Sequence, residues 1–170
     1  MKNYTHYIPY IIFLVSVLGF CTLIFIAPYS AHLGEDNQGF SKISDIAYYF
    51  FHPVCHQSPE RSFFIYDHKL GVCARCTGIY LGILILAILY PIFRSADDIS
   101  TPSKYYLIAC IIPMAIDGGT QITGLRESFN ELRFATGFIF GGTLTFYLIP
   151  VFNQLSKIIY RKLCDNLYRN

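Results

Sequence analysis

The most informative pattern in the chain is a series of long apolar runs separated by polar segments. A run of about 20 apolar residues is long enough to cross the hydrocarbon core of a bilayer as a helix. Four such runs occur, at about residues 7–29, 74–93, 105–122 and 131–152. The pattern therefore predicts an all-α integral membrane protein with four transmembrane helices in one membrane domain, residues 1–170.

The first run has an alternative interpretation as a secretory signal peptide. The apolar part of a signal peptide covers about 7–15 residues and is followed by a cleavage site with small side chains. This run is longer, and it ends in the sequence Ile26-Ala27-Pro28-Tyr29. A retained transmembrane helix is therefore the favoured interpretation.

The segment from residue 30 to 71, between the first two runs, has a different pattern. Its apolar residues recur at helical spacing, namely Phe40, Ile43, Ile46, Ala47, Phe50 and Val54. This spacing predicts an amphipathic helix that lies on the membrane surface and ends before Pro53. Ser58-Pro59 resembles a helix start and predicts a short helix through Tyr66. The segment is expected to form a cap on the membrane surface.

The tail after the fourth run is expected to form a separate short C-terminal helix on the cytoplasmic face. Four spans place both termini at one end of the bundle, which holds seven basic residues against five at the other end. The positive-inside rule then favours a cell-membrane protein with cytoplasmic termini and an extracytoplasmic motif face.

Two Gly-xxx-Gly pairs, Gly78/Gly82 and Gly137/Gly141, permit close helix packing, although glycine is also common in membrane helices generally.

The composition is typical of a membrane protein and gives no sign of a nucleic-acid partner. Hydrophobic residues make up 54% of the chain and charged residues 14%, whereas about 25% is usual in soluble domains. The formal net charge is only +2, and no basic stripe indicates nucleic-acid binding.

Cysteine and histidine residues cluster on both sides of the second span's start. Cys73 and Cys76 form a Cys-x-x-Cys pair, and Cys55-His56 precedes it. Four such ligands suit tetrahedral zinc, so these residues predict a zinc site. His52 or His68 is an alternative to His56, because adjacent side chains diverge. A redox pair assisted by Arg75, or a structural disulfide from Cys55, remains an alternative to the metal.

A second group of polar residues centres on Asp117, within the third run. Ionisable residues inside a membrane are costly, so Asp117 is the candidate catalytic acid or base. Nearby arginines and amides suggest a site for an anionic group. The predicted substrate-binding residues are Gln57, Arg61, Arg75, Gln121, Arg126, Asn130 and Arg133. The alternatives are that Asp117 simply pairs with Arg126 or Arg133, and that Arg133 extends to the membrane surface.

The motifs resemble those of an uncharacterised prokaryotic family of predicted membrane proteins, domain of unknown function 2085. The resemblance covers about residues 45–145. It rests on Cys55-His56-Gln57, Arg61-Ser62-Phe63-Phe64, Cys73-Ala74-Arg75-Cys76-Thr77-Gly78-Ile79-Tyr80, Asp117-Gly118 with Thr120-Gln121, and the segment Arg126 to Arg133. It implies a polytopic membrane fold and these motif positions, and it adds no chemistry.

Three functional hypotheses follow from these residues. The first is a zinc-containing membrane enzyme that acts on an anionic, lipid-like substrate. The second is a thiol–disulfide oxidoreductase coupled to a quinone. The third is a small transporter or a non-catalytic assembly factor, in which zinc or a disulfide is a structural crosslink.

Overall fold

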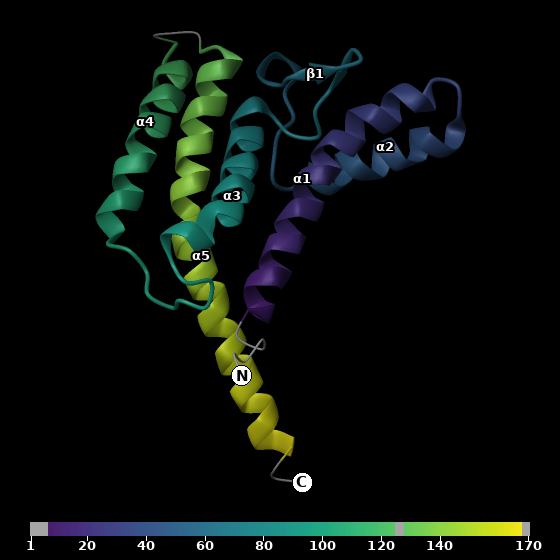
Figure 1. Cartoon of the computed structure of the whole chain (residues 1–170). Helices are drawn as coiled ribbons and strands as arrows, with labels where there is room; N and C mark the ends of the chain where they lie inside the picture. The colour runs from purple at the N-terminus through teal and green to yellow at the C-terminus, as the bar shows by residue number, and fades with distance from the viewer. Residues whose placement is uncertain (1–6, 125–127, 168–170) are drawn as a thin grey trace.

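The computed structural model describes residues 7–124 and 128–167, with the side chains of 122 and 163–167 excepted. Helices dominate these residues (Figure 1). The elements are α1 (Ile8–Gly34), α2 (Gln38–Phe51), the 3-10 helix η2 (Pro59–Arg61), β1 (Phe64–Ile65), β2 (His68–Lys69), α3 (Ala74–Phe93), α4 (Lys104–Ile122) and α5 (Asn130–Leu167). Apolar helices of this length make the chain a helical membrane protein.

Three of the described helices are long and apolar enough to cross a membrane, namely α1, α3 and α5. The predicted second span coincides with α3. The predicted third span is helical as α4, but it is not among the three. Its composition is the reason, because Lys104, Asp117 and the polar sequence that follows Asp117 interrupt the apolar run.

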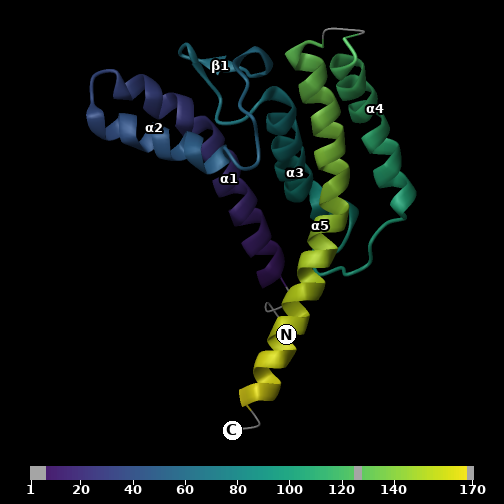
Figure 2. The same cartoon turned by 180° about the vertical axis from the view of Figure 1, so that it is seen from behind.

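Helices α3, α4 and α5 form a packed layer, and α1 crosses beside them (Figures 1 and 2). The start of α3, the end of α4 and the start of α5 lie at one end of this layer, together with the β1–β2 hairpin. The candidate residues that precede α3 and those near the end of α4 therefore lie at the same end of the layer. We refer to this end as the motif end.

Glycine allows α3 and α5 to pack with their backbones in contact. A Cβ atom on Gly78 or Gly82 of α3 would overlap the carbonyl oxygen of Phe134 or Phe138. A Cβ atom on Gly141 of α5 would overlap the backbone of Ile79. The two Gly-xxx-Gly pairs therefore lie at the α3–α5 contact, where small residues permit close approach.

Helix α2 turns back along the second half of α1 and forms a helical hairpin with it (Figure 1). Its inward face consists of Ser44, Ala47 and Phe51. Its other large apolar side chains are exposed, and Ile46, for example, is 69% exposed. The predicted amphipathic helix is therefore present and ends before Pro53.

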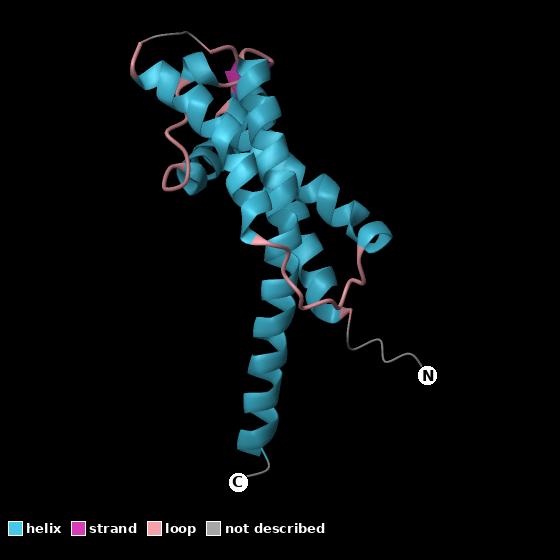
Figure 3. Ribbon diagram, turned by 90° about the vertical axis from the view of Figure 1, so that its left-hand side faces the viewer, coloured by secondary structure: helices cyan, strands magenta, loops and turns pink. Residues whose placement is uncertain are grey.

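Two predictions about local structure are wrong. The helix predicted after Ser58 is only the three-residue η2, and an antiparallel hairpin pairs Phe64 with Lys69 and Ile65 with His68. No separate C-terminal helix forms within the described residues, because α5 continues without a break through Pro150 to Leu167 (Figure 3). Residues 151–162 contain no glycine or second proline to end it.

Candidate functional site: a thiol cluster and an Asp–Arg centre around the start of α3

The start of α3 positions both groups of candidate residues. Cys73 is the N-cap residue in extended conformation, and Cys76 lies three residues later. Residues three apart share a helix face, whereas Arg75, two after Cys73, leaves the helix in another direction. The sequence Cys-Ala-Arg-Cys therefore directs two thiols to one side and a guanidinium to another.

The thiols of Cys55, Cys73 and Cys76 form a compact cluster. Their three Sγ atoms all lie within 4.8 Å of one another, and all three residues are free cysteines. Tetrahedral zinc with bonds of about 2.3 Å to sulfur places sulfur atoms about 3.8 Å apart. The cluster could therefore hold a metal ion with small side-chain adjustments, with one coordination position left for another ligand.

Hydrogen bonds converge on the sulfur of Cys55. The backbone N–H of Gln57 donates to it at 3.4 Å and that of Cys73 at 3.2 Å. The thiols of Cys73 and Cys76, together with these two N–H groups, hold the pKa of Cys55 well below its usual value. The hydrogen bond to Cys55 and burial raise the pKa of Cys73. Cys55 is therefore the thiol of the group that loses its proton most readily, and the thiolate is the form that binds a metal or attacks a disulfide.

Apolar side chains surround the thiol cluster on the α1–α2 side. Cys55 is buried with Ile24, Phe51, Leu70 and Val72. Phe51 is fully buried, and its ring meets that of Phe20 edge-on at 5.0 Å between centroids. The cluster is therefore shielded on this side by the core that attaches the cap to α1.

The predicted ligand His56 is not a member of the thiol group, and its side chain is exposed. The two alternatives also lie elsewhere, because His52 is exposed and His68 contacts Glu35. Gln57 is buried, and it connects two parts of the cap by hydrogen bonds instead of lining an open site. Its side-chain amide donates to the backbone carbonyl of Tyr48, and its backbone carbonyl accepts a hydrogen bond from the Lys69 ammonium group.

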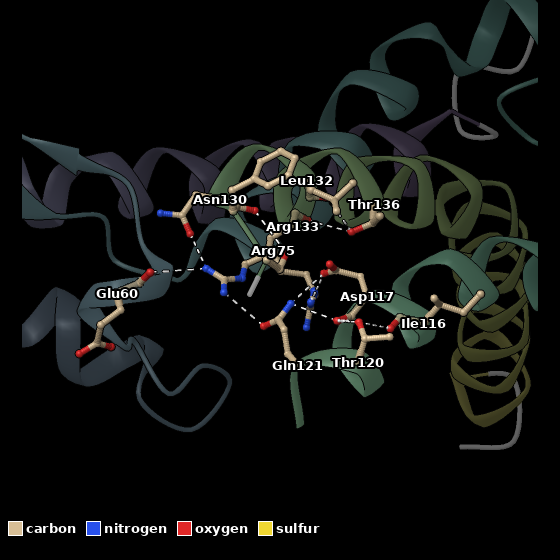
Figure 4. Close-up of polar contacts among 12 residues, drawn as sticks. Glu60, Arg75, Ile116, Asp117, Thr120, Gln121, Asn130, Leu132, Arg133 and Thr136 are labelled. Carbon is tan, nitrogen blue, oxygen red and sulfur yellow. Dashed lines mark hydrogen bonds and ion pairs between the residues drawn. The ribbon is translucent and has the colours of Figure 1, made fainter. Parts of the chain in front are cut away.

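Asp117 and Arg75 form an ion pair on the other side of α3 (Figure 4). The Arg75 Nη2 atom lies 2.5 Å from the Asp117 Oδ2 atom, and the carboxylate is only 3% exposed. Gln121 donates from its amide nitrogen to the same oxygen at 3.2 Å. Among the described residues, Asp117 therefore pairs with Arg75 and not with Arg133. The other arginine that the sequence argument considered, Arg126, lies outside the described residues.

Arg133 joins this centre to the cap (Figure 4). Its Nη2 donates to the side-chain oxygen of Gln121 at 3.2 Å, and its Nη1 donates to Asn130 at 2.8 Å and to the carbonyl of Glu60 at 3.4 Å. Asn130 donates in turn to the carbonyl of Ser62. Arg133 is 8% exposed, so it is a buried link in the network and does not extend to the surface.

Three arginines, Arg61, Arg75 and Arg133, and the two acidic residues Asp117 and Glu60 lie in or beside this network. Arg61 is exposed on η2, whereas the Nε atoms of Arg75 and Arg133 are buried without a hydrogen-bond partner among the described residues. The predicted residue Arg126 lies outside the described residues.

A groove between α4 and α5 leads to Asp117. It has a volume of about 370 Å³ and is lined by Pro113, Ile116, Asp117, Thr120, Leu132 and Thr136. Most of this lining is apolar, and Ile116 is 60% exposed. Sequence reasoning identified Asp117 but missed the α5 side of the groove, because Leu132 and Thr136 have no motif that distinguishes them from other helix residues.

The two centres face different neighbours. The thiols contact the core between α1, α2 and α3, whereas Arg75 reaches Asp117 on α4. The candidate residues thus form two adjacent centres that share the first turn of α3.

Comparisons with known proteins identify a family of predicted membrane proteins. Residues 55–147, more than half of the chain, match the family described as predicted membrane protein (DUF2085). An uncharacterized protein of Methanocaldococcus jannaschii, MJ1492, is 52% identical over 162 residues, which cover 95% of this chain and 99% of that protein. An uncharacterized protein of Methanothermobacter thermautotrophicus is 43% identical over 90 residues, which cover 51% of this chain and 77% of that protein. No solved structure matches the chain.

Proposed function

The chain belongs to the DUF2085 family of predicted membrane proteins, and from this premise we propose that it binds an anionic, lipid-like molecule at the Asp117–Arg75 centre. In this proposal the thiol cluster holds zinc and fastens the cap beside that centre. The observation that carries the proposal is the groove between α4 and α5, whose apolar walls end at a buried carboxylate bonded to an arginine.

The proposal treats α4 as a fourth transmembrane helix. Its 19 residues correspond to about 28 Å at 1.5 Å per residue, close to the thickness of the hydrocarbon core. Asp117 lies about one and a half turns before the end of α4. Its charge is compensated by Arg75, as expected for an ionisable residue within a membrane bundle. Both termini would be cytoplasmic, with the motif end outside, in a cell-membrane protein.

Charge and shape support an amphiphilic ligand. An acyl chain fits the apolar wall formed by Pro113, Ile116 and Leu132. The anionic head group would lie at the motif end, near the guanidinium groups of Arg61 and Arg133. Guanidinium groups bind phosphate and carboxylate through paired hydrogen bonds.

Asp117 is the candidate acid or base if the ligand is also a substrate. Its carboxylate lines the groove, so it is within reach of a hydroxyl group or an ester bond near the head group. Arg75 and Gln121 bind one carboxylate oxygen and thereby orient the group. Proton transfer at Asp117 is therefore the reaction type that this arrangement favours.

Zinc at Cys55, Cys73 and Cys76 would connect the loop after α2 to the first turn of α3. Three thiolate donors suit zinc, and the nearby Arg75 would keep its position because the turn that carries it is fixed. The zinc in this proposal is structural and not catalytic, since the thiols and the Asp117 groove lie on different sides of α3.

Ligand binding is tested by thermal unfolding in a neutral detergent with added lipid. A lipid with an anionic head group should raise the melting temperature more than a zwitterionic lipid with the same chains, because a ligand stabilises the state that binds it. Ile116→Trp should abolish the difference by filling the groove. Ile108→Trp is the matched control, because Ile108 is also exposed on α4 but does not line the groove. Equal stabilisation by both lipids would contradict the proposal.

Zinc binding is tested by metal analysis of protein purified under reducing conditions without chelators. We expect stoichiometric zinc in the unmodified protein and its loss in Cys73→Ser. Cys110→Ser is the control, since Cys110 lies on α4 and contacts Thr143 instead of the thiol cluster. Equal zinc in the two variants would exclude the thiol cluster as the zinc site.

The free thiols favour a second candidate function, thiol–disulfide exchange coupled to a membrane quinone. Two thiols of the cluster would form a disulfide, and the two electrons and two protons released would reduce the quinone to a quinol. Addition of a quinone to the reduced protein should then lower the number of alkylatable thiols by two. An unchanged number would eliminate this candidate.

A further inference from the structure

We propose that His32, Glu35 and His68 form a second metal site, which binds a divalent transition-metal ion independently of the thiol cluster. The three residues come from two distant parts of the chain. His32 lies in the last turn of α1 and Glu35 is the C-cap residue of that helix, whereas His68 belongs to β2. The cap fold brings them together at the tip of the α1–α2 hairpin.

The ligand atoms of the three side chains already lie close to a metal-binding arrangement. The His68 Nε2 atom is 3.0 Å from the Glu35 Oε1 atom, and the ligand atoms of all three residues lie within 4.8 Å of one another. Zinc with bonds of about 2.0–2.1 Å to nitrogen and oxygen places tetrahedral ligands about 3.3 Å apart. The largest closing movement needed is therefore about 1.5 Å, which exposed side chains can make.

The β1–β2 hairpin places the two imidazoles near Glu35. The ring of Tyr66 stacks on that of His32, with 4.6 Å between centroids and an angle of 13°. Tyr66 and the next residue, Asp67, both have positive φ values, of 52° and 62°. Non-glycine residues adopt this conformation at a cost, which must be offset by surrounding contacts. The strained turn thus presents His68 to Glu35 while Tyr66 covers His32.

A cavity beside the three residues leaves room for a further ligand. It has a volume of about 370 Å³, and Glu35 and His68 form part of its wall together with Ala31, Gly34, Ser41, Ser44, Asp45 and Tyr48. The carboxylate of Asp45 adds negative charge next to the site. Two imidazoles and one carboxylate with an open fourth position form a donor set that transition metals favour, with water or another oxygen ligand in the last position.

The alternative is a simple surface ion pair between His68 and Glu35. Such a pair does not require His32, whereas a metal site does. His32→Ala therefore separates the two interpretations, because it leaves the His68–Glu35 contact intact. His52→Ala is the matched control, since His52 is exposed and belongs to neither metal-binding group.

The test is titration of the detergent-solubilised chain with cobalt(II), followed by absorption and calorimetry. We expect two sites in the unmodified protein, and thiolate-to-cobalt charge transfer should report only the thiol cluster. His32→Ala and His68→Ala should each lose the second site, with affinity lowered at least about tenfold, while charge transfer persists. His52→Ala should retain both sites.

Two results would overturn the proposal. One is unchanged affinity at the second site in both His32→Ala and His68→Ala. The other is that all bound cobalt gives thiolate charge transfer, with no binding left after the thiols are alkylated. If the unmodified protein binds cobalt without any thiolate charge transfer, the thiol site of the proposed function is wrong, whereas the second site is not affected. The two proposals therefore fail separately.

Discussion

Replacement of Gly141 by alanine tests whether the close contact between α3 and α5 determines the stability of the bundle. A Cβ atom at this position would lie 2.7 Å from the carbonyl carbon of Ile79 and 2.8 Å from its Cα atom, and closer still to its oxygen. Real Cβ atoms essentially never approach other atoms more closely than 3.0 Å. Because the opposing atoms belong to the backbone, no rotamer change can relieve the overlap, and the helices must separate.

The cost of this separation can be estimated from known effects of overpacking. One inserted methyl group in a well-packed core typically costs about 1–3 kcal/mol, and a backbone clash belongs at the upper end of that range. For a chain of this size, about 3 kcal/mol corresponds to a fall in melting temperature of roughly 6–12 °C. The measurement is thermal unfolding in a fixed detergent, followed by circular dichroism.

Gly119→Ala and Gly19→Ala are the matched controls for Gly141→Ala. Both glycines are helical, and a Cβ atom at either position would meet nothing within 4 Å. Both variants should melt close to the unmodified protein. If Gly141→Ala melts within about 2 °C of Gly119→Ala, the reasoning from backbone contact is refuted.

Three further predictions concern buried contacts. Arg75→Ala should lower the free energy of unfolding by about 3–5 kcal/mol, because it removes an ion-pair partner of a carboxylate that is 3% exposed; Arg75→Ala/Asp117→Asn should recover part of this loss, and equal loss in both would contradict the ion-pair argument. Phe51→Ala should cost about 3–5 kcal/mol and increase trypsin cleavage at Lys42, since Phe51 is fully buried between α2 and α1; an unchanged cleavage rate would show that Phe51 does not attach the cap. Asn153→Ala should cost about 1–3 kcal/mol, because the Asn153 amide donates to the carbonyls of Ala96 at 2.9 Å and Asp98 at 3.0 Å; the exposed Gln154→Ala should cost little, and an equal effect of both on the unfolding midpoint would disprove the role of these hydrogen bonds.

Local sequence patterns carry most of the information about the helices. The predicted second span at residues 74–93 coincides with α3, and the amphipathic pattern predicts α2 and its end before Pro53. Both features depend on short-range periodicity and on residues that stop a helix. The same reasoning failed after Ser58, because a Ser-Pro start is equally compatible with a 3-10 turn, and the β1–β2 pairing that follows depends on residues further along.

The candidate residues show a similar division. Cys55, Cys73 and Cys76 were identifiable from their type and spacing, and the structure brings them together. His56 was grouped with them because it is adjacent to Cys55 in sequence. Gln57 has a positive φ of 51° and a buried side chain, and it is Cys55 and Gln57 that face inward. The direction in which neighbouring side chains point in a turn cannot be derived from their order.

By itself, the sequence determined that this is a helical membrane protein, which of its residues are candidates for a functional site and to which family it belongs, because apolar run length and residue type are local properties. Only the tertiary structure decided that Arg75 leaves the Cys-x-x-Cys turn to pair with Asp117, that a groove opens between α4 and α5, and that His32, Glu35 and His68 converge. Each of these depends on how helices distant in sequence are positioned relative to one another. That positioning follows from close packing at glycines and from the path of the cap, which no single segment specifies.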